Sequence, residues 1–209
     1  MIKAVLWDFG GVILTSPFEA FATYESERGL PDGFLRLVNA TNPDANAWAR
    51  LERSELTGAE FDAEFARESA ALGHEVPGRD VLAVLLGDLR PEMVAALDAV
   101  QSAGLVTACL TNNVTGEFER PEIEAVMQRF DVVVESSKVG VRKPEPRFYE
   151  IACELLDVAP DECVFLDDLG INLKPAKAMG MTTIKVGDPA VAIAELSAVL
   201  GLPLDDAKA

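Results

Sequence analysis

The chain has 209 residues, of which 49 % are hydrophobic and 25 % are charged, a composition that suits one folded domain or one domain with an insertion. Its 35 acidic and 18 basic residues give a formal net charge of −17 at pH 7. Because this charge repels nucleic acid and anionic membrane surfaces, we expect neither as a partner, and an anionic small substrate would need a metal ion or a lysine beside it.

The first predicted strand covers residues 2–7 (IKAVLW) and ends at Asp8. After it comes a long interval without strand-like runs of comparable strength, in which Thr57 and Glu60 have the spacing of a capping box. Helical patterns in this interval cover 18–29, 44–55, 59–73 and 79–89. We interpret residues 16–90 as a helical bundle inserted after the first strand, a helical cap domain.

Four further strand-like runs follow, at 105–111, 131–136, 163–167 and 182–186. They are continuously apolar, which is typical of strands buried on both faces of a sheet. Helical patterns alternate with them, at 91–104, 120–130, 144–156 and 190–200. The alternation predicts an α/β fold, a Rossmann-like, doubly wound, parallel five-stranded sheet, with residues 1–15 and 91–209 as its core domain.

The cysteines and the single histidine limit the possible chemistry. Cys109, Cys153 and Cys163 lack metal-ligand spacing, so we expect reduced thiols in the core, and His74 alone cannot form a two-histidine metal site. The N-terminal apolar run ends at Asp8, unlike a signal peptide, and no apolar run is long enough to span a membrane. We therefore expect a cytoplasmic protein.

Polar side chains follow the first four predicted strands at the point where each strand ends. They are Asp8, then Thr111, Asn112 and Asn113, then Lys138, Arg142 and Lys143, then Asp167 and Asp168. Ligands of open parallel sheets bind outside the carboxyl ends of the strands, where the winding order reverses. The sequence therefore predicts one polar site at that edge of the sheet.

These residue types suit phosphoryl transfer. Asp8 can act as a nucleophile that forms an aspartyl phosphate, and with Asp167 and Asp168 it offers the oxygen ligands that Mg²⁺ prefers. Thr111 can bind phosphate oxygens, and Lys143 can neutralise charge in the transition state. Each residue alone would be interpreted as a turn, a solvated acid or a surface lysine. Their occurrence after four successive strands favours a common site.

Four segments resemble, in this order, the motifs of haloacid dehalogenase superfamily hydrolases. They read VLWDFGGVI, CLTNN, GVRKPEPRFY and VFLDDLGINLKPAKAMGMTTI. The long interval between the first two resembles the subfamily with an inserted helical cap. Within the superfamily, the sequences of these motifs are most similar to those of phosphatase-like N-terminal domains that are fused to enzymes of lipid and acyl-CoA metabolism. The resemblance implies a hydrolase, a phosphoric monoester phosphatase with Mg²⁺ as cofactor.

The resemblance also implies a metal site. Asp8 would be a Mg²⁺ ligand as well as the nucleophile, and the backbone carbonyl of Gly10 would be a second ligand. Asp168 would be a third ligand, with Asp167 beside it as a ligand or an anchor. Asn172, near the start of the next helix, would support this acidic loop.

The phosphoryl group would be held by residues of the second and third motifs. Thr111 and Asn112 would bind it, and Lys143 would bridge it to Asp8, so that Asp8, Thr111 and Lys143 form the catalytic set. In the inserted bundle, Arg50, Glu52 and Arg53 lie on a charged joint that would lie over the site and could bind the substrate.

Gly10 departs from the family pattern. Most phosphatases of the superfamily carry a second Asp at this position, which protonates the leaving oxygen and later activates water. General acid–base catalysis of this kind contributes roughly 10²–10⁴-fold. A substrate with a good leaving group, a proton donor from the substrate, or a donor from the cap such as Glu52 could replace it.

Three functions remain open on this basis. The first is a Mg²⁺-dependent phosphatase acting on a small phosphorylated metabolite. The second is a catalytically weak or inactive domain that binds phosphate or docks a partner. The third is a 2-haloacid dehalogenase, which the Asp167–Asp168 pair disfavours because two acids would repel a carboxylate substrate. A monomer and a homodimer are both compatible with the sequence.

Overall fold

A parallel sheet of five strands forms the centre of the core, in the order β3-β2-β1-β4-β5. The computed structural model describes residues 1–85, 87–114 and 120–204. The strands are β1 (Ala4–Trp7), β2 (Val106–Thr111), β3 (Val132–Glu135), β4 (Cys163–Asp167) and β5 (Thr182–Lys185). Each lies inside its predicted run, and the predicted fold class is confirmed.

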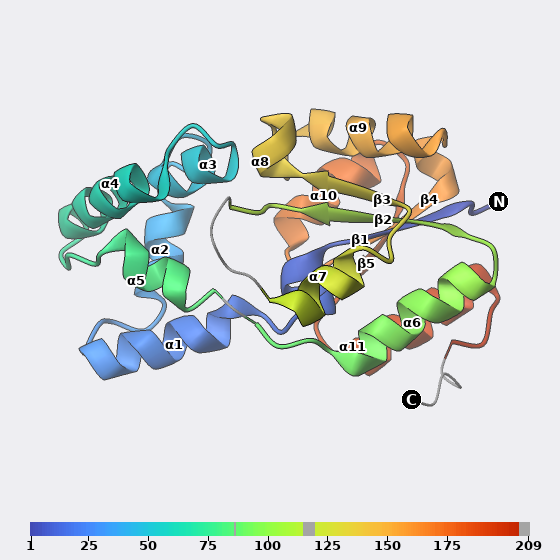
Figure 1. Ribbon diagram of the computed structural model, residues 1–209, viewed down its shortest axis with the longest axis horizontal. Helices are drawn as coiled ribbons and strands as arrows, with labels where there is room; N and C mark the ends of the chain where they lie inside the picture. Colours follow the sequence, from blue (N-terminus) through green and yellow to red (C-terminus); the bar gives the residue numbers. More distant parts are fainter. Residues whose placement is uncertain (86, 115–119, 205–209) are drawn as a thin grey trace.

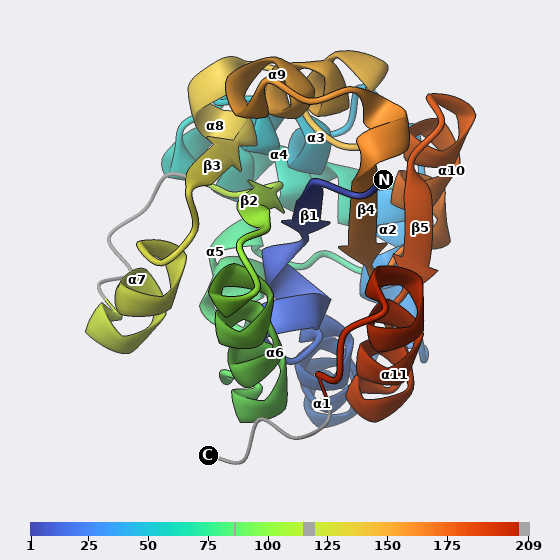
Figure 2. The ribbon, with the colours of Figure 1, turned by 90° about the vertical axis from the view of Figure 1, so that its right-hand side faces the viewer.

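Helices cover both faces of the sheet, as Figure 2 shows with the strands side by side. One face packs on α6 and α11, and the other packs on α9 and α10. The helices of the core are α6 (Pro91–Ser102), α7 (Pro121–Met127), α8 (Ser136–Val139), α9 (Pro146–Leu156), α10 (Gly170–Ala178) and α11 (Pro189–Leu200), with the short turn η2 (Pro160–Glu162) before β4. Because both faces are covered, β1 and β4 are buried throughout, which explains their unbroken apolar sequences.

The winding order reverses beside β1. The chain passes from β1 outward to β2 and β3, then returns to β4 on the other side of β1. The carboxyl ends of β1 and β4 are therefore the two sides of the crevice in which ligands of such sheets bind. Asp8 follows β1, and Asp167 is the last residue of β4.

Five helices between β1 and α6 form a separate helical unit with its own hydrophobic cluster, seen at the left of Figure 1. They are α1 (Pro17–Arg28), α2 (Phe34–Ala40), α3 (Ala47–Glu52), α4 (Gly58–Ala71) and α5 (Gly78–Ala83). The predicted capping box is confirmed, because the Thr57 side chain and the Glu60 side chain each bond the other's backbone N–H at the start of α4.

Two helices of this unit differ from the sequence-based expectation. Helix α2 was not predicted, because its seven residues are too few for a clear period, although Phe34, Leu35 and Val38 are buried in the cluster. Helix α5 ends at Ala83, well before Leu89, and Leu89 pairs with Leu14 in an isolated bridge.

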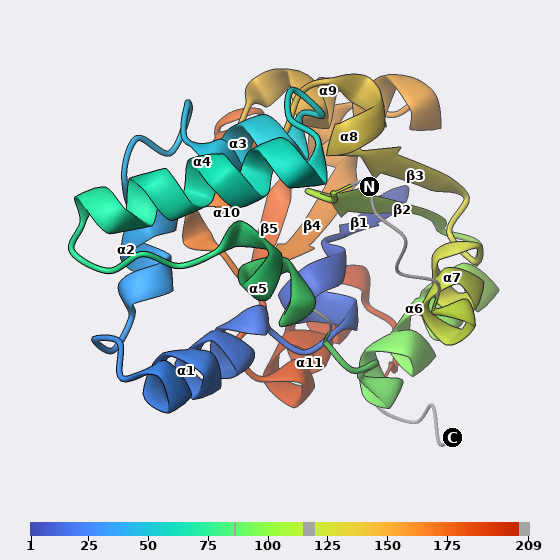
Figure 3. The same cartoon turned by 60° about the vertical axis from the view of Figure 1, so that its left-hand side comes forward.

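The two connections between the helical unit and the core run side by side. Besides the Leu14–Leu89 bridge, Thr15 N–H donates to Asp88 O at 2.8 Å and Arg90 N–H donates to Ile13 O at 2.9 Å. Both connections lie next to the turn that follows Asp8, so the helical unit lies beside the carboxyl end of the sheet. Figure 3 shows this arrangement with the helical unit turned toward the viewer.

The remaining sequence expectations concern single residues and segments. All three cysteines are free and buried, as expected, and His74 is exposed. Among the described residues, no helix combines the length and the apolar character needed to cross a bilayer.

Candidate active site

Asp8 begins a tight turn at the end of β1. Its Oδ1 accepts a hydrogen bond from Phe9 N–H at 2.6 Å, which caps the turn η1 (Phe9–Ile13). Gly10 has an extended backbone (φ −71°, ψ 126°), whereas Gly11 has φ +81°, which favours glycine. A Cβ on Gly11 would lie 2.4 Å from Asp168 Oδ2, so the bare turn lets Asp168 approach the backbone beside Asp8.

Lys143 connects the two strand ends. Its side chain is 1 % exposed, and its Nζ lies 2.7 Å from Asp8 Oδ1 and 2.9 Å from Asp167 Oδ2. Burial lowers the pKa of Lys143, but the charges of Asp167 and Asp8 outweigh it, and the net shift is upward. The ammonium is therefore held charged between two buried carboxylates.

Asp167 is fixed from several sides. Its Oδ1 accepts from Leu169 N–H at 2.8 Å, and Asn172 Nδ2 lies 3.1 Å from both of its carboxylate oxygens. Tyr149 in turn helps to fix Asn172, because its hydroxyl donates to the backbone carbonyl of Asn172 at 2.7 Å. Asn172 thus has the geometry of a support for the acidic loop.

Asp8, Asp167 and Asp168 form a group that could hold a metal ion, since one carboxylate oxygen from each lies within 4.8 Å of the others. Burial raises the pKa of Asp8 well above its usual range against the opposing effect of Lys143. Burial, followed by the charge of Asp167, raises the pKa of Asp168 to about 6. One ammonium for three crowded carboxylates leaves excess negative charge, and hard oxygen donors fit a divalent cation such as Mg²⁺.

Thr111 and Asn112 follow from the end of β2. Thr111 is its last residue and is buried. Asn112 holds the backbone of Lys143 on both sides: its Oδ1 accepts from Lys143 N–H at 2.8 Å, and its Nδ2 donates to the Lys143 carbonyl at 3.0 Å. The next residue, Asn113, bonds Glu135 and Ser137 instead.

A cavity of about 840 Å³ opens beside Asp8 and Gly10. Asp168, Thr111 and Asn112 also line it. Most of the remaining wall is apolar and comes from both the helical unit and the core: Phe9, Leu14, Pro17, Phe18, Phe21, Pro43, Trp48, Leu85, Val114, Ile123, Met127, Pro144, Leu169 and Ile171. The nucleophile candidate therefore stands at a chamber with predominantly apolar walls.

The three residues expected from the charged joint lie in different places. Glu52 lines the cavity and is buried. Burial raises the pKa of Glu52, partly offset by the nearby guanidinium of Arg142. Arg53 instead donates to the Asp44 carbonyl and lies close to Glu55 and Glu145, and Arg50 lies near Glu55. Arg50 and Arg53 are not among the residues that line the cavity.

Two residues of the site were not identified from the sequence. Arg142 was noted only as part of a basic loop, yet it lines the cavity and pairs with Glu52. Trp48 packs on Phe61 at 5.6 Å between ring centroids and also lines the cavity. The position of Arg142, directly before the candidate catalytic residue Lys143, could have indicated from the sequence that Arg142 lies near the site.

Residues 2–180 match the family described as haloacid dehalogenase-like hydrolases. The chain is 35 % identical over 207 residues to mouse acyl-CoA dehydrogenase family member 10 and 32 % identical over 223 residues to mouse bifunctional epoxide hydrolase 2. It is 27 % identical over 206 residues to the sesquiterpene phosphatase astK of Aspergillus oryzae. The chain belongs to the haloacid dehalogenase-like hydrolases and is an enzyme of that family.

The matches cover different shares of these proteins. They include 97 % and 99 % of this chain but only 19 % and 40 % of the two mouse proteins, whereas the match to the fungal phosphatase covers 95 % of this chain and 97 % of that protein. A haloacid dehalogenase family enzyme of Bacteroides thetaiotaomicron, solved with magnesium and inorganic phosphate, shares the fold. Its TM-score is 0.59 at 22 % identity, over 90 % of this chain and 96 % of that one.

Proposed function

We propose that this chain is a Mg²⁺-dependent phosphatase that hydrolyses a small phosphorylated metabolite through an aspartyl phosphate at Asp8. The observation that carries the proposal is the position of Lys143 Nζ between Asp8 and Asp167, with Asp168 in the same carboxylate group. A nucleophile, a counter-charge and a set of metal ligands thus lie together, and Asp8 and Asp168 of this group line the cavity. The relative named as a phosphatase and the neighbour solved with magnesium and phosphate support this choice.

The proposed reaction has two displacements at phosphorus. A carboxylate oxygen of Asp8 attacks, a new Asp8 O–P bond forms, and the bond to the leaving oxygen breaks with its electron pair going to that oxygen. A water molecule then attacks the aspartyl phosphate, and the bond from Asp8 to phosphorus breaks with its electron pair returning to the Asp8 carboxylate. Inorganic phosphate is released, and the proton that the water loses balances the proton that the leaving oxygen takes up from solvent or substrate. Asp8 and Asp168, with the Gly10 carbonyl as an expected further ligand and Asp167 as a ligand or an anchor, would hold Mg²⁺, which would neutralise phosphate charge.

Lys143 and Thr111 would act at the phosphoryl group, and Asn112 would hold Lys143 in place. The Lys143 ammonium already lies 2.7 Å from the attacking carboxylate, where it would orient Asp8 and balance charge that builds up in the transition state. Thr111 would donate its hydroxyl to the phosphoryl group, and Asn112 would fix Lys143 through its backbone.

The apolar cavity walls favour a substrate whose organic part, beyond the phosphate group, is apolar. An apolar chamber beside a polar rim fits a phosphate ester with an apolar body, because burial of that body contributes roughly 25 cal/mol per Å². The printed name of the fungal relative, a sesquiterpene phosphatase, agrees with this class. We therefore place phosphate esters with an apolar organic part first among candidate substrates, beside acyl phosphates, whose leaving groups need no proton.

The experiment that tests the proposal is phosphate release from a panel of alkyl, aryl and acyl phosphates, with Mg²⁺ and with a chelator. We expect release that requires Mg²⁺. Absence of release from every substrate would contradict the proposal and favour a phosphate-binding or partner-docking domain. Halide release from 2-haloacids without a metal would instead favour a dehalogenase.

Mg²⁺ is also expected to stabilise the folded chain. A ligand that binds only the folded state adds about 2.7 kcal/mol to the free energy of unfolding at a hundredfold excess over its Kd. Thermal or denaturant unfolding with increasing Mg²⁺ measures this gain. Asp168→Asn should remove most of it, whereas Asp161→Asn, an exposed acid outside the group, should keep it. An equal gain in both variants would contradict the assigned site.

Restoring an acid at position 10 is expected to accelerate turnover of alkyl phosphates. Gly10 has backbone angles that any residue can adopt, no atom lies within 4 Å of an added Cβ, and the residue lines the cavity. Gly10→Asp should raise kcat for an alkyl phosphate by about 10²–10⁴-fold, because the leaving alkoxide would then receive a proton.

Gly10→Asn is the matched control, since it has the same size and no acidic proton. We expect it to leave alkyl phosphate turnover near the wild-type rate, and both variants to change aryl phosphate turnover far less. A gain of equal size in Gly10→Asn would show that the effect does not come from proton transfer.

A further inference from the structure

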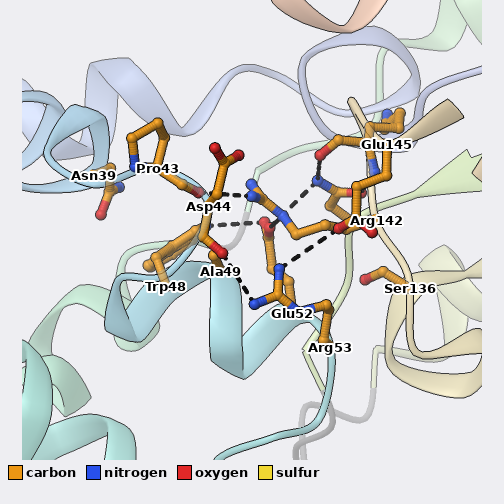
Figure 4. A network of polar contacts seen from close by, with 12 residues as sticks. Asn39, Pro43, Asp44, Trp48, Ala49, Glu52, Arg53, Ser136, Arg142 and Glu145 are labelled. Atoms are coloured by element: carbon orange, nitrogen blue, oxygen red, sulfur yellow. Dashed lines mark hydrogen bonds and ion pairs between the residues drawn. The ribbon is translucent and has the colours of Figure 1, made fainter.

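Glu52, the last residue of α3, links the helical unit to two loops of the core. Its side chain is buried, with 6 % of the residue exposed. Its Oε1 accepts from Trp48 Nε1 at 2.9 Å, while its Oε2 accepts from Asn112 Nδ2 at 3.3 Å and from Arg142 Nε. Figure 4 shows the side chains of Glu52, on α3, and Arg142, in the core segment between α8 and α9, pointing toward each other. Both carboxylate oxygens of Glu52 are therefore occupied as acceptors.

Asn112 extends this contact to Lys143. The same Nδ2 group that reaches Glu52 also donates to the backbone carbonyl of Lys143, and the side-chain Oδ1 of Asn112 accepts from Lys143 N–H. The side chain of Asn112 thus lies between a carboxylate of the helical unit and the backbone of the residue that joins Asp8 and Asp167. One amide group therefore joins Glu52 to the backbone of Lys143.

Arg142 provides a second link in the same loop. Its side chain is 14 % exposed, and besides pairing with Glu52 it donates from Nη1 to the Pro43 carbonyl at 3.0 Å. Arg142 is adjacent to Lys143 in the chain, so consecutive residues are bound, one to the helical unit and the other to the carboxylates of the core. Without Glu52 this guanidinium would keep only the Pro43 carbonyl as a hydrogen-bond partner within residues 1–85, 87–114 and 120–204.

We infer that Glu52 is a positioning residue that couples the placement of the helical unit to the placement of Lys143. Three of the four acceptor positions of its carboxylate are filled, and all three donors favour the ionised form, which has no proton to give to a leaving group. Its role differs in this respect from that of a cap residue which supplies the missing acid. The kinetic consequence of this inference rests on the proposed function, whereas its structural consequence does not.

The structural consequence is measured by hydrogen exchange of single backbone amides. In Glu52→Gln, an amide N–H would face the donors of Asn112 or Arg142, so the arrangement around Asn112 should loosen. We expect the Lys143 amide to exchange about tenfold faster, which corresponds to weakening one buried hydrogen bond. The amide of Leu110, inside β2, should keep its wild-type rate. An unchanged Lys143 amide would overturn the inference.

The kinetic consequence distinguishes a positioning residue from a proton donor. Glu52→Gln should lower kcat by about 10²-fold, because a small displacement of Lys143 is enough for such a loss. The loss should be the same for aryl and alkyl phosphates, with little change in KM. A loss that grows with the basicity of the leaving group would identify Glu52 as an acid and overturn the inference.

Arg142→Met removes the same contact from the core side and serves if Glu52→Gln does not fold. We expect it to reproduce both effects, and the double variant to lose less than the two single losses combined. Glu55→Gln, at a half-exposed acid that pairs with Arg53 nearby, should stay within about twofold of wild type. If the wild-type chain releases no phosphate at all, the proposed function fails while the amide exchange still decides the role of Glu52.

Discussion

Asp8→Asn is expected to abolish phosphate release, with a loss of roughly 10⁴-fold or more in kcat. An amide oxygen is a far weaker nucleophile than a carboxylate and cannot form the aspartyl phosphate, and the metal group loses one of its three carboxylates. The exchange changes one atom, and Lys143 keeps its contact with Asp167, so the fold should persist. Initial rates of phosphate release with Mg²⁺ measure the effect, and circular dichroism checks the fold.

Asp44→Asn is the matched control for Asp8→Asn. Asp44 also lines the cavity, but it is exposed and is not part of the carboxylate group. Its variant should remain within about twofold of the wild-type rate, as is usual for surface substitutions. Residual activity in Asp8→Asn that equals the activity of Asp44→Asn would mean that Asp8 is not the nucleophile.

Lys143→Met is expected to reduce both stability and turnover. Methionine fills much of the volume but leaves Asp8 and Asp167 buried without their shared cation. Removing one partner of a buried ion pair typically costs about 3–5 kcal/mol, because the remaining charge is uncompensated. We expect a loss of that size in the free energy of unfolding, measured by denaturant titration without a metal, and a loss of most phosphatase activity.

Mg²⁺ should recover part of the stability of Lys143→Met, because a cation in the carboxylate group replaces some of the missing charge, but it should not restore turnover. Lys138→Met, in the nearby helix α8, is the control: its side chain is 72 % exposed and its ammonium pairs with Glu135. That variant should unfold close to the wild-type midpoint. Equal midpoints for the two variants would contradict a structural role of the buried ammonium.

The strands and the meeting of polar residues at their carboxyl ends could be predicted because both follow from patterns visible along the sequence. Strands buried on both faces, such as β1 and β4, need unbroken apolar runs, and such runs are visible without knowledge of their neighbours. Parallel strands place their carboxyl ends at one edge, so the approach of Asp8, Lys143 and Asp167 follows from the order of the elements alone.

The contacts between the helical unit and the core could not be predicted in this way. Glu52 and Arg142 are 90 residues apart and belong to elements whose relative placement no local period encodes. Arg53, five residues after Trp48 in the same charged segment, contacts Asp44 and Glu145 instead. Which residue of such a segment reaches the cavity depends on the rotation of α3, and this is decided by packing of the whole helical unit.

The central claim is that Asp8 carries the phosphoryl group during turnover. The most direct test is to quench the wild-type enzyme in acid during turnover of its best substrate from the panel, digest it, and search the peptides by mass spectrometry for a bound phosphoryl group. We predict one phosphoryl group on the peptide that contains Asp8, dependent on Mg²⁺ and absent from Asp8→Asn. Steady phosphate release with no phosphorylated peptide in rapid-quench samples from the first turnover onward, or a phosphoryl group on another residue, would contradict the account.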